Sequence, residues 1–259
     1  MRFDVITLFP ELFAPFLTSG VTRRAYESGL VDVKLWNPRD FADGNYRRVD
    51  DRPFGGGPGM VMLAEPLALC LAAIRAERTS GIDPVVLFSP FGNVLNHASV
   101  ESWSHGHGAV LVCGRYEGID QRFIDKHVTH QISLGDFVLS GGEIAAMALL
   151  DAIARLQPGV LNDEGSHQMD SFNPALDGLL DCPHYTRPED WQGQTVPAAL
   201  MSGNHASIES FRREQRLMLT QQLRPDLVKK ARDAGQLTLK DKAFLASVIA
   251  ESAVSGELL

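Results

Sequence analysis

Short apolar runs alternate with amphipathic segments through the first part of the chain, a pattern that predicts an α/β fold. The run 109–113 is continuously apolar and contains β-branched residues, as in a strand that is covered on both faces. The alternation of strand and helix favours a parallel sheet. The predicted strands span 3–8, 31–36, 85–88, 109–113 and 130–134, and the predicted helices begin at Pro10 or span 19–29, 64–78, 96–103 and 141–156.

Two of these helices carry a predicted serine cap. Ser19 precedes the helix 19–29, and Ser140 precedes the helix 141–156. The second helix has a periodic apolar stripe that should face the core. The residues at its core-like positions are Ile144, Met147, Ala148 and Ile153.

The chain changes character after residue 159. The segment 160–179 is polar and has no period, which is typical of an interdomain linker. Helical periods return at 206–223, 225–234 and 237–251, and Lys and Arg outnumber Asp and Glu between Arg212 and Lys242. Such a charge run is usually a solvated helical face; the alternative is a surface that contacts phosphates.

Composition narrows the class of protein. Of the 259 residues, 44% are hydrophobic and 22% are charged, as in ordinary globular proteins. No apolar run reaches the roughly 18 residues of a membrane span, and the N-terminus, with acidic residues inside its apolar stretch, differs from a signal peptide. Three cysteines without a CxxC pair favour reduced thiols in a cytoplasmic protein. A net charge of −8 requires any nucleic-acid surface to be local.

Glycine-bearing turns follow the predicted strands. Gly114 and Gly118 follow the strand 109–113, and Gly135 follows the strand 130–134. Turns at the ends of neighbouring strands are where an open α/β sheet usually builds its ligand pocket. The loop 37–59 ends in GGGPG, which matches neither a Walker loop nor a dinucleotide fingerprint. This loop is either a surface connection or, as we favour, a wall of the active site.

Longer motifs carry a specific resemblance. The chain contains, in this order, LFPELF, NPRDF, DDRPFGGGPGM, VCGRYEGID, LGDFVLSGGE, PGVL, DSF, LLDCPHYTRP and SGNH. It thereby closely resembles the bacterial tRNA (guanine-N1)-methyltransferases. The resemblance implies an α/β fold of the SPOUT class, in which the parallel sheet contains a deep trefoil knot, plus a small all-helical C-terminal domain. It divides the chain into a knotted S-adenosylmethionine-binding domain at 1–159, the linker at 160–179 and a helical tRNA-binding domain at 180–259.

The implied reaction is S-adenosylmethionine-dependent methylation of guanine N1 at tRNA position 37, immediately 3′ of the anticodon. Backbone N–H and C=O groups of three loops would read the adenine and ribose of the donor where side chains leave them open. Phe137 stands where the family more often has tyrosine, so ring packing survives without the hydroxyl. The implied cofactor-binding residues are Leu87, Phe88, Ser89, Pro90, Gly114, Tyr116, Glu117, Ser133, Leu134, Gly135, Asp136, Phe137, Val138, Leu139, Gly141 and Gly142.

Methylation at N1 needs a base to remove the N1 proton and a cation near O6, where negative charge develops. The resemblance assigns these roles to Asp170 and Arg155, with Asp181 as the reserve base and with Asp163 and Glu164 ranked lower. Outside the resemblance, Asp170 is an ordinary linker carboxylate, and Arg155 is a cation that interacts with a helix dipole.

The resemblance also implies partners. The family works as a homodimer in which each site combines the knot of one subunit with the linker and C-terminal domain of the other. His184, Arg187 and the helix 212–216 would contact the anticodon stem-loop, from which the target guanine is splayed out. A Mg²⁺ requirement is attributed to the family, and Glu117 with Asp170 would supply its oxygen ligands.

Two other functions compete with this interpretation. A kinase or hydrolase could use the GGGPG loop for phosphates, although no lysine adjoins those glycines. A non-catalytic RNA-binding adaptor could keep the fold, although the presence of Arg155, Asp170 and Glu117 argues against it. Calorimetry with ATP and with S-adenosylmethionine separates all three hypotheses.

Overall fold

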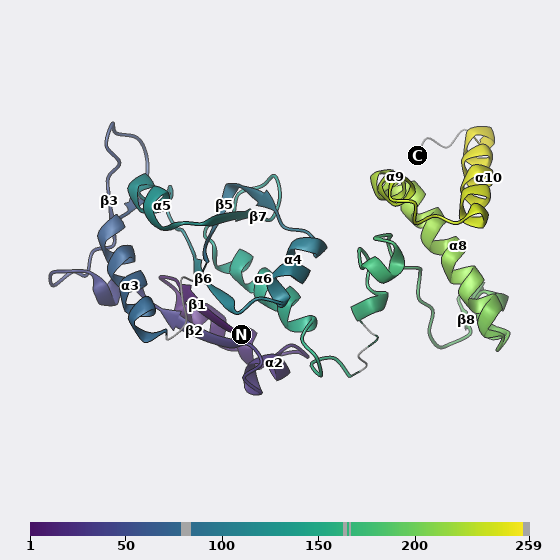
Figure 1. Ribbon diagram of the computed structural model, residues 1–259, viewed down its shortest axis with the longest axis horizontal. Coiled ribbons are helices and arrows are strands. Elements are labelled where there is room, and N and C mark those ends of the chain that lie inside the picture. The colour runs from purple at the N-terminus through teal and green to yellow at the C-terminus, as the bar shows by residue number, and fades with distance from the viewer. Residues whose placement is uncertain (79–83, 163–164, 166, 256–259) are drawn as a thin grey trace. The chain divides into compact units, whose positions relative to one another are not determined.

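The computed structural model describes residues 1–78, 84–162, 165 and 167–255, and the chain divides into two compact units (Figure 1). The first unit is Met1–Asn162 and the second is Asp163–Leu259. None of the helices in the described part of the chain has the length and apolar composition needed to cross a membrane.

The first unit is built on a five-stranded sheet whose neighbouring strands all run parallel, in the order β2-β1-β6-β5-β7. This arrangement confirms the parallel sheet predicted from the alternating pattern. Every residue of β6 is buried, as expected for a strand covered on both faces. The strands are β1 (Arg2–Ile6), β2 (Asp32–Trp36), β5 (Val85–Val94), β6 (Gly108–Val112) and β7 (His130–Ser133).

Helices cover both faces of this sheet (Figure 1). On one face, α1 (Phe13–Thr18), α2 (Arg23–Glu27), α4 (His97–Ser104) and α6 (Glu143–Arg155) share a core with the sheet. On the other face, α3 (Ala64–Glu77) and α5 (Gln121–His127) do so. The connections add the 3-10 turns η1 (Pro10–Leu12) and η2 (Pro38–Phe41) and the short antiparallel pair β3 (Asp50–Asp51) and β4 (Val61–Met62).

Two helices begin later than the sequence pattern predicts. α2 begins at Arg23, and Ser19 instead occupies the C-cap position of α1. α6 begins at Glu143 with Gly142 at its N-cap position, so Ser140 does not cap it. The Gly142 N–H donates to the carbonyl of Gly114 at 3.0 Å, and this tertiary contact fixes where the helix begins.

The buried face of α6 also differs from the predicted one. Ile153 is buried as expected, but Ile144 is 54% exposed and Ala148 is exposed. The helix is apolar on more than one face, and the sheet can cover only one of them. Met147 is partly buried and packs against this core, as predicted, and the buried residues that pack on the sheet are Ala145, Ala146, Leu149, Leu150, Ile153 and Ala154.

Strand β5 continues beyond its predicted end at residue 88. It pairs with Ile132 of β7 twice, through Phe88 and again through Asn93, so the residues between them bulge out of the ladder. Gly92 returns the chain to β7 at very close range, because a Cβ there would lie 2.4 Å from the carbonyl carbon of Gln131.

The second unit packs mainly helices around a core that includes Leu179, Leu217 and Leu245. Asn204 caps its longest helix by accepting from the N–H groups of Ala206 and Ser207. A short antiparallel pair, β8 with β9, is added to the all-helical domain that was expected. The elements are η3 (His167–Met169), η4 (Pro174–Leu176), β8 (Asp190–Trp191), β9 (Gln194–Thr195), α7 (Ala198–Met201), α8 (His205–Leu223), α9 (Pro225–Asp233) and α10 (Leu239–Ser255).

The segment 160–179, expected to be a linker, is shared between the two units. Val160 is fully buried in the core of the first unit. Leu176 and Leu179 are buried in the second unit, where Leu179 packs in the helical core. Which part of the segment acts as a tether stays a prediction.

Candidate functional site

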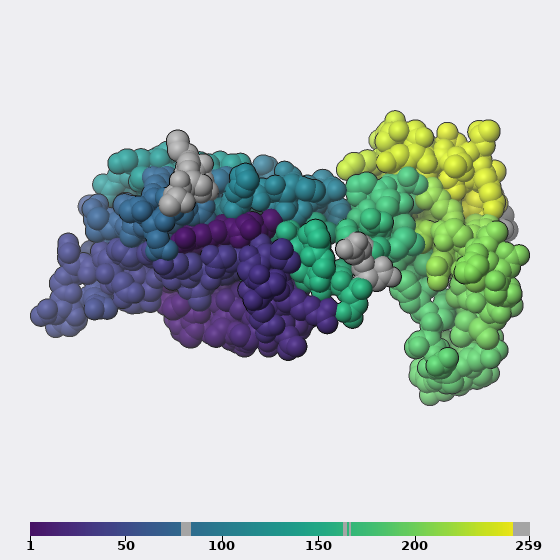
Figure 2. Space-filling model, turned by 60° about the horizontal axis from the view of Figure 1, so that its bottom comes forward, coloured from purple at the N-terminus to yellow at the C-terminus, as the bar shows by residue number. Residues whose placement is uncertain are grey.

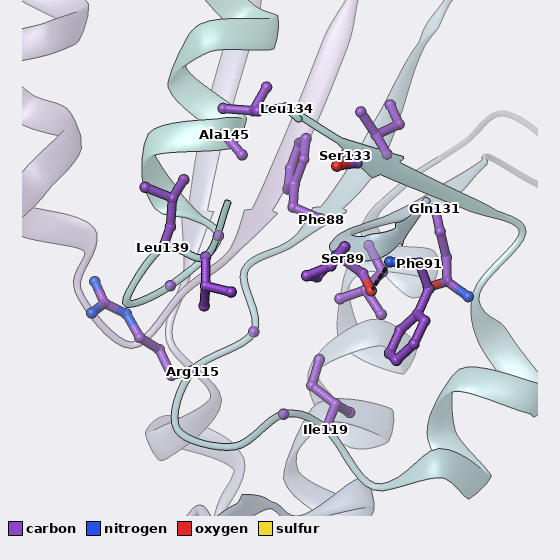
Figure 3. A pocket seen from close by; sticks show the side chains of 18 of the residues that line it. Phe88, Ser89, Phe91, Arg115, Ile119, Gln131, Ser133, Leu134, Leu139 and Ala145 are labelled. Carbon is purple, nitrogen blue, oxygen red and sulfur yellow. Dashed lines mark hydrogen bonds between the residues drawn. The ribbon is translucent and has the colours of Figure 1, made fainter. Parts of the chain in front are cut away.

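A cavity of about 620 Å³ opens at the carboxyl ends of β5, β6 and β7 (Figure 3). Its volume is typical of a small-molecule site, and the carboxyl edge of a parallel sheet is the usual position for one. Its walls come from β5 (Phe88, Ser89 and, in the bulge, Phe91), the turn after β6 (Arg115, Ile119), β7 and its turn (Gln131, Ser133, Leu134, Leu139) and the first turn of α6 (Ala145).

The cavity brings together every residue assigned to the cofactor by the resemblance except Gly135 and Asp136. Asp136 is exposed and is not among the lining residues. Gly135 shapes the turn instead: its φ of +148° is one that side chains rarely adopt, and its carbonyl accepts from the Ser133 hydroxyl at 3.1 Å. Arg115 and Gly118, in the turn predicted to build the pocket, also line it; lining residues that the sequence did not indicate are Phe91, Ile119, Gln121, Ile124, Gln131, Ile132, Ser140 and Ala145.

None of residues 37–59 is among the residues that line this cavity, so a role of the glycine-rich loop as a wall of the active site stays a prediction. The segments on either side of β3 lie at the surface of the first unit (Figure 2, blue), where Tyr46 and Phe54 are 94% and 100% exposed. The end of the loop contacts Glu117, one of the residues that line the cavity. The Glu117 N–H donates to Met60 at 2.9 Å, and a Cβ on Gly59 would lie 2.3 Å from the Glu117 carboxylate.

A buried chain of polar side chains lies beside the cavity and was not predicted. The Thr7 hydroxyl donates to Glu143 Oε1 at 2.8 Å, and Glu143 Oε2 lies 2.9 Å from Nε of Arg115. The Glu143 side chain is 1% exposed. Arg115 and Glu143 lie within the motifs GRYEGID and LGDFVLSGGE, and a charged residue inside a glycine-rich turn could have marked them as functional. Nothing in the sequence around Thr7 indicates that it takes part.

Arg155 lies far from this cavity within its own chain. It ends α6, whose beginning lines the cavity, and twelve residues of helix span about 18 Å. It lines a separate cavity of about 300 Å³ with Asp151, Phe16 and the turn Ser19–Thr22. These two cavities share no lining residue.

The candidate bases lie in the second unit, apart from Asp163 and Glu164, which are outside the described residues. Asp170 is half-buried just after η3, with its N–H bonded to the His167 carbonyl at 3.3 Å. Asp181 is committed elsewhere: its carboxylate accepts from the Cys182 N–H and pairs with His184 at 2.9 Å and Arg216 at 3.4 Å. Burial alone would raise the pKa of Asp181, but these hydrogen bonds and charges outweigh it and lower the pKa.

The donor set fits a magnesium ion poorly. Glu117 is the single carboxylate among the residues that line the cavity. Within the described residues, no group of three or more His, Cys, Asp or Glu side chains could hold a metal ion. Mg²⁺ favours octahedral oxygen ligands, usually with more than one carboxylate or phosphate contribution, and the lone carboxylate of this cavity does not supply such a set.

Comparison with known proteins identifies the family of this chain. A family model described as "tRNA (Guanine-1)-methyltransferase TrmD" matches residues 1–230. A protein of Polaromonas sp. strain JS666 named tRNA (guanine-N(1)-)-methyltransferase is 78% identical over 251 residues, which cover 96% of this chain and 97% of that protein. A protein of the same name from Albidiferax ferrireducens is 73% identical, over 96% of this chain and 100% of that protein. Another from Bordetella pertussis is 56% identical, over 97% of this chain and 99% of that protein. The chain therefore belongs to the TrmD family of tRNA (guanine-1)-methyltransferases.

Proposed function

We propose that this protein transfers a methyl group from S-adenosylmethionine to N1 of the guanine at tRNA position 37, in the cytoplasm. The main support is that the loops assigned to the donor by the resemblance line one cavity, at the carboxyl ends of β5, β6 and β7. The chain also belongs to this methyltransferase family. A phosphate-transfer function is disfavoured, because the GGGPG loop lies outside the cavity.

The cavity has the groups that an adenosine-containing cation requires. Phe88, Leu134 and Leu139 offer apolar walls for the adenine, and the turns at 114–118 and 139–142 offer backbone polar groups for its edges. Glu117, an exposed carboxylate on the cavity, is placed to bind the ammonium group of the methionine part. The bound sulfonium would supply an activated methyl group.

We assign the general base to Asp170 rather than to Asp181. Asp170 stands in the motif that the resemblance assigns to the base, whereas Asp181 is held by Arg216, His184 and a backbone N–H that all stabilise its ionised form. Its lowered pKa makes it a weaker proton acceptor. The Asp170 N–H is bonded to the His167 carbonyl at 3.3 Å, which fixes its backbone in the turn that follows η3.

Arg155 is proposed to stabilise the developing charge on O6 from the partner subunit of a homodimer. The separation along α6 supports action across an interface, since Arg155 and the donor cavity lie at opposite ends of that helix. Exposed apolar side chains beside the cavity support an interface there: Phe137 is 55%, Val138 84% and Ile144 54% exposed.

A heterodimer experiment tests this assignment. A chain with Arg155→Ala and a chain with Glu117→Ala, each deficient as a homodimer, should form heterodimers with about half of the wild-type turnover, because one of the two composite sites is then intact. Two affinity tags allow the heterodimer to be purified and assayed. Heterodimers as inactive as both parents would place Arg155 in the site of its own chain.

The RNA-binding surface proposed for the second unit needs one revision. The Arg216 side chain is 4% exposed and pairs with Asp181 and Glu209, so it cannot contact the anticodon stem-loop. Arg213 is also committed, to Asp177 at 2.8 Å and Asp241 at 3.0 Å. Exposed arginines and lysines remain at Arg212 and Arg187 and, on α9, at Lys229, Lys230 and Arg232, while the exposed His184 is bonded to Asp181 at 2.9 Å.

The exposed lysines of α9 give a measurable prediction. Lys229→Ala with Lys230→Ala should weaken tRNA binding and reduce the slope of log Kd against log salt by about one for each lost phosphate contact. Arg224→Ala is the matched control, because that neighbouring arginine is already neutralised by Asp226 at 2.8 Å. Filter binding at several salt concentrations measures both variants. Equal slopes for the double variant and the wild type would remove α9 from the RNA surface.

The trefoil knot of the SPOUT class is part of the proposal. Its support is the tight approach of segments that are far apart in sequence. A Cβ on Gly92 would meet the backbone of Gln131, and one on Gly142 would lie 2.8 Å from the Cα of Cys113. Such contacts are expected where the chain passes closely around its own loops.

A further inference from the structure

We propose that Arg115 is a positioning residue, which Glu143 and Thr7 hold in place so that it fixes the two turns of the donor cavity relative to each other. The identity of the ligand rests on the proposed function, but the arrangement of these three side chains does not. They come from three segments: the end of β1, the turn after β6 and the first turn of α6.

These contacts are buried, so breaking one leaves a polar group inside the protein without its partner. Thr7 is fully buried and the Glu143 side chain is 1% exposed. An ionised carboxylate so far from water is costly unless it is paired. The Thr7 hydroxyl supplies one contact at 2.8 Å, and Arg115 Nε supplies the other as an ion pair at 2.9 Å without hydrogen-bond alignment.

Arg115 reaches both turns at once. Its own residue belongs to the turn after β6, while its Nη1 donates to the carbonyl of Ser140 at 3.3 Å in the turn before α6. The guanidinium also lies over the ring of Phe9, 4.4 Å from the ring centroid. A planar group with several donors can make these contacts together, which the single ammonium of lysine cannot.

Gly141 shows how closely the turns are held. A Cβ on Gly141 would lie 2.2 Å from Arg115 Nε and 2.6 Å from Glu143 Oε2. The backbones of Arg115 and Gly141 form an isolated β-bridge, and both residues line the cavity (Arg115 in Figure 3). Any loosening of the Arg115–Glu143 pair therefore changes the separation of the two cavity walls.

The expected consequence is a loss of donor affinity rather than of the chemical step. The turns hold the donor, whereas the proposed base and the proposed O6 cation lie elsewhere, at Asp170 and Arg155. At saturating donor concentration, the bound donor orders the cavity again in these variants. The chemical step then proceeds as in the wild type, so kcat should be nearly retained. A residue that touched the reacting atoms would lower kcat instead.

The test measures donor Kd by calorimetry, KM and kcat on a tRNA transcript, and the melting temperature, for Arg115→Gln, Glu143→Gln and Thr7→Val. The first two variants should raise the donor Kd and KM roughly ten- to hundredfold, with kcat within about threefold of wild type. Thr7→Val should raise Kd a few-fold, roughly, and Thr7→Ser, which restores the hydroxyl, should recover it.

Arg78→Gln is the matched control. Arg78 is a 4% exposed arginine paired with the fully buried Asp4 at 2.6 Å, at the opposite, amino-terminal edge of the same sheet. It should lower the melting temperature while leaving the donor Kd unchanged. If the Arg115, Glu143 and Thr7 variants do the same, their role is only structural and the proposal is overturned. A fall in kcat at unchanged Kd would also overturn it.

These outcomes are separate from a failure of the proposed function. If the wild-type protein does not bind S-adenosylmethionine, both the function and this inference fail. If the wild type binds it and the three variants bind it equally well, only the positioning role of Arg115 is lost.

Discussion

Asp170→Asn is expected to lower kcat for guanine methylation by about 10²–10⁴-fold, because the amide cannot accept the N1 proton. Donor binding should persist, since Asp170 does not line the donor cavity. The nearly isosteric amide also keeps the shape of the turn that follows η3. Single-turnover methyl transfer to a tRNA transcript gives the chemical rate, and calorimetry gives the donor Kd.

Asp181→Asn is the informative comparison for this variant. Removing the Asp181 charge leaves Arg216, 4% exposed, with Glu209 as its remaining ionic contact among the described residues. It should therefore lower the melting temperature but leave the single-turnover rate at saturating tRNA within about tenfold of wild type. The reverse result, a lost rate in Asp181→Asn and near-normal transfer in Asp170→Asn, would move the base to Asp181.

Gly92→Ala is expected to lower both the melting temperature and the donor affinity, because the added methyl group collides with backbone atoms beside the donor cavity. The added Cβ would lie 2.4 Å from both the carbonyl carbon of Gln131 and the N of Ile132. These are backbone atoms of the neighbouring strand and cannot rotate away. The bulge of β5 must then separate from β7, which costs about 1–3 kcal/mol, or roughly 2–12 °C in melting temperature. Phe91 and Gln131 line the cavity at this point, so donor affinity should fall roughly tenfold or more.

Gly114→Ala is the matched control, because it adds a methyl group without a collision with backbone atoms. Its Cβ would meet only the Ile119 and Leu87 side chains, at 3.6 and 3.9 Å, which is ordinary contact. Its melting temperature should stay within about 3 °C of wild type. A Gly92→Ala protein that melts and binds S-adenosylmethionine like the wild type would show that the close approach of β5 to β7 does not shape the cavity.

Much of the first unit could be predicted from the sequence because its central strands, β1 and β6, are buried on both faces. The run 109–113 is apolar without interruption, which marks β6 directly. The pattern failed where tertiary contacts override local preference. Ser140 has the chemistry of a cap, yet α6 begins at Glu143 because Gly142 is bonded to Gly114. Ile144 is as apolar as a core residue, and hydrophobicity alone cannot tell a core from an exposed interface.

The turns that line the cavity could be predicted because their motifs follow the strands, whereas contacts between residues distant in sequence could not. Thr7 and Glu143 are 136 positions apart in sequence, so their hydrogen bond leaves no local pattern. Arg213 and Arg216 look like free cations in a charge run, but their acidic partners lie in other segments or on another turn of the helix. Charge counts cannot reveal such pairing, and for that reason the proposed RNA surface moves toward α9.

Methyl incorporation into matched tRNA transcripts tests the central claim most directly. The wild-type protein is incubated with labelled S-adenosylmethionine and transcripts that differ only in having G or A at position 37, and the modified base is identified by mass spectrometry. We predict that label enters only the G37 transcript, as N1-methylguanine at that position. Incorporation at another base, equal labelling of both transcripts, or no labelling by a protein that binds tRNA would contradict it.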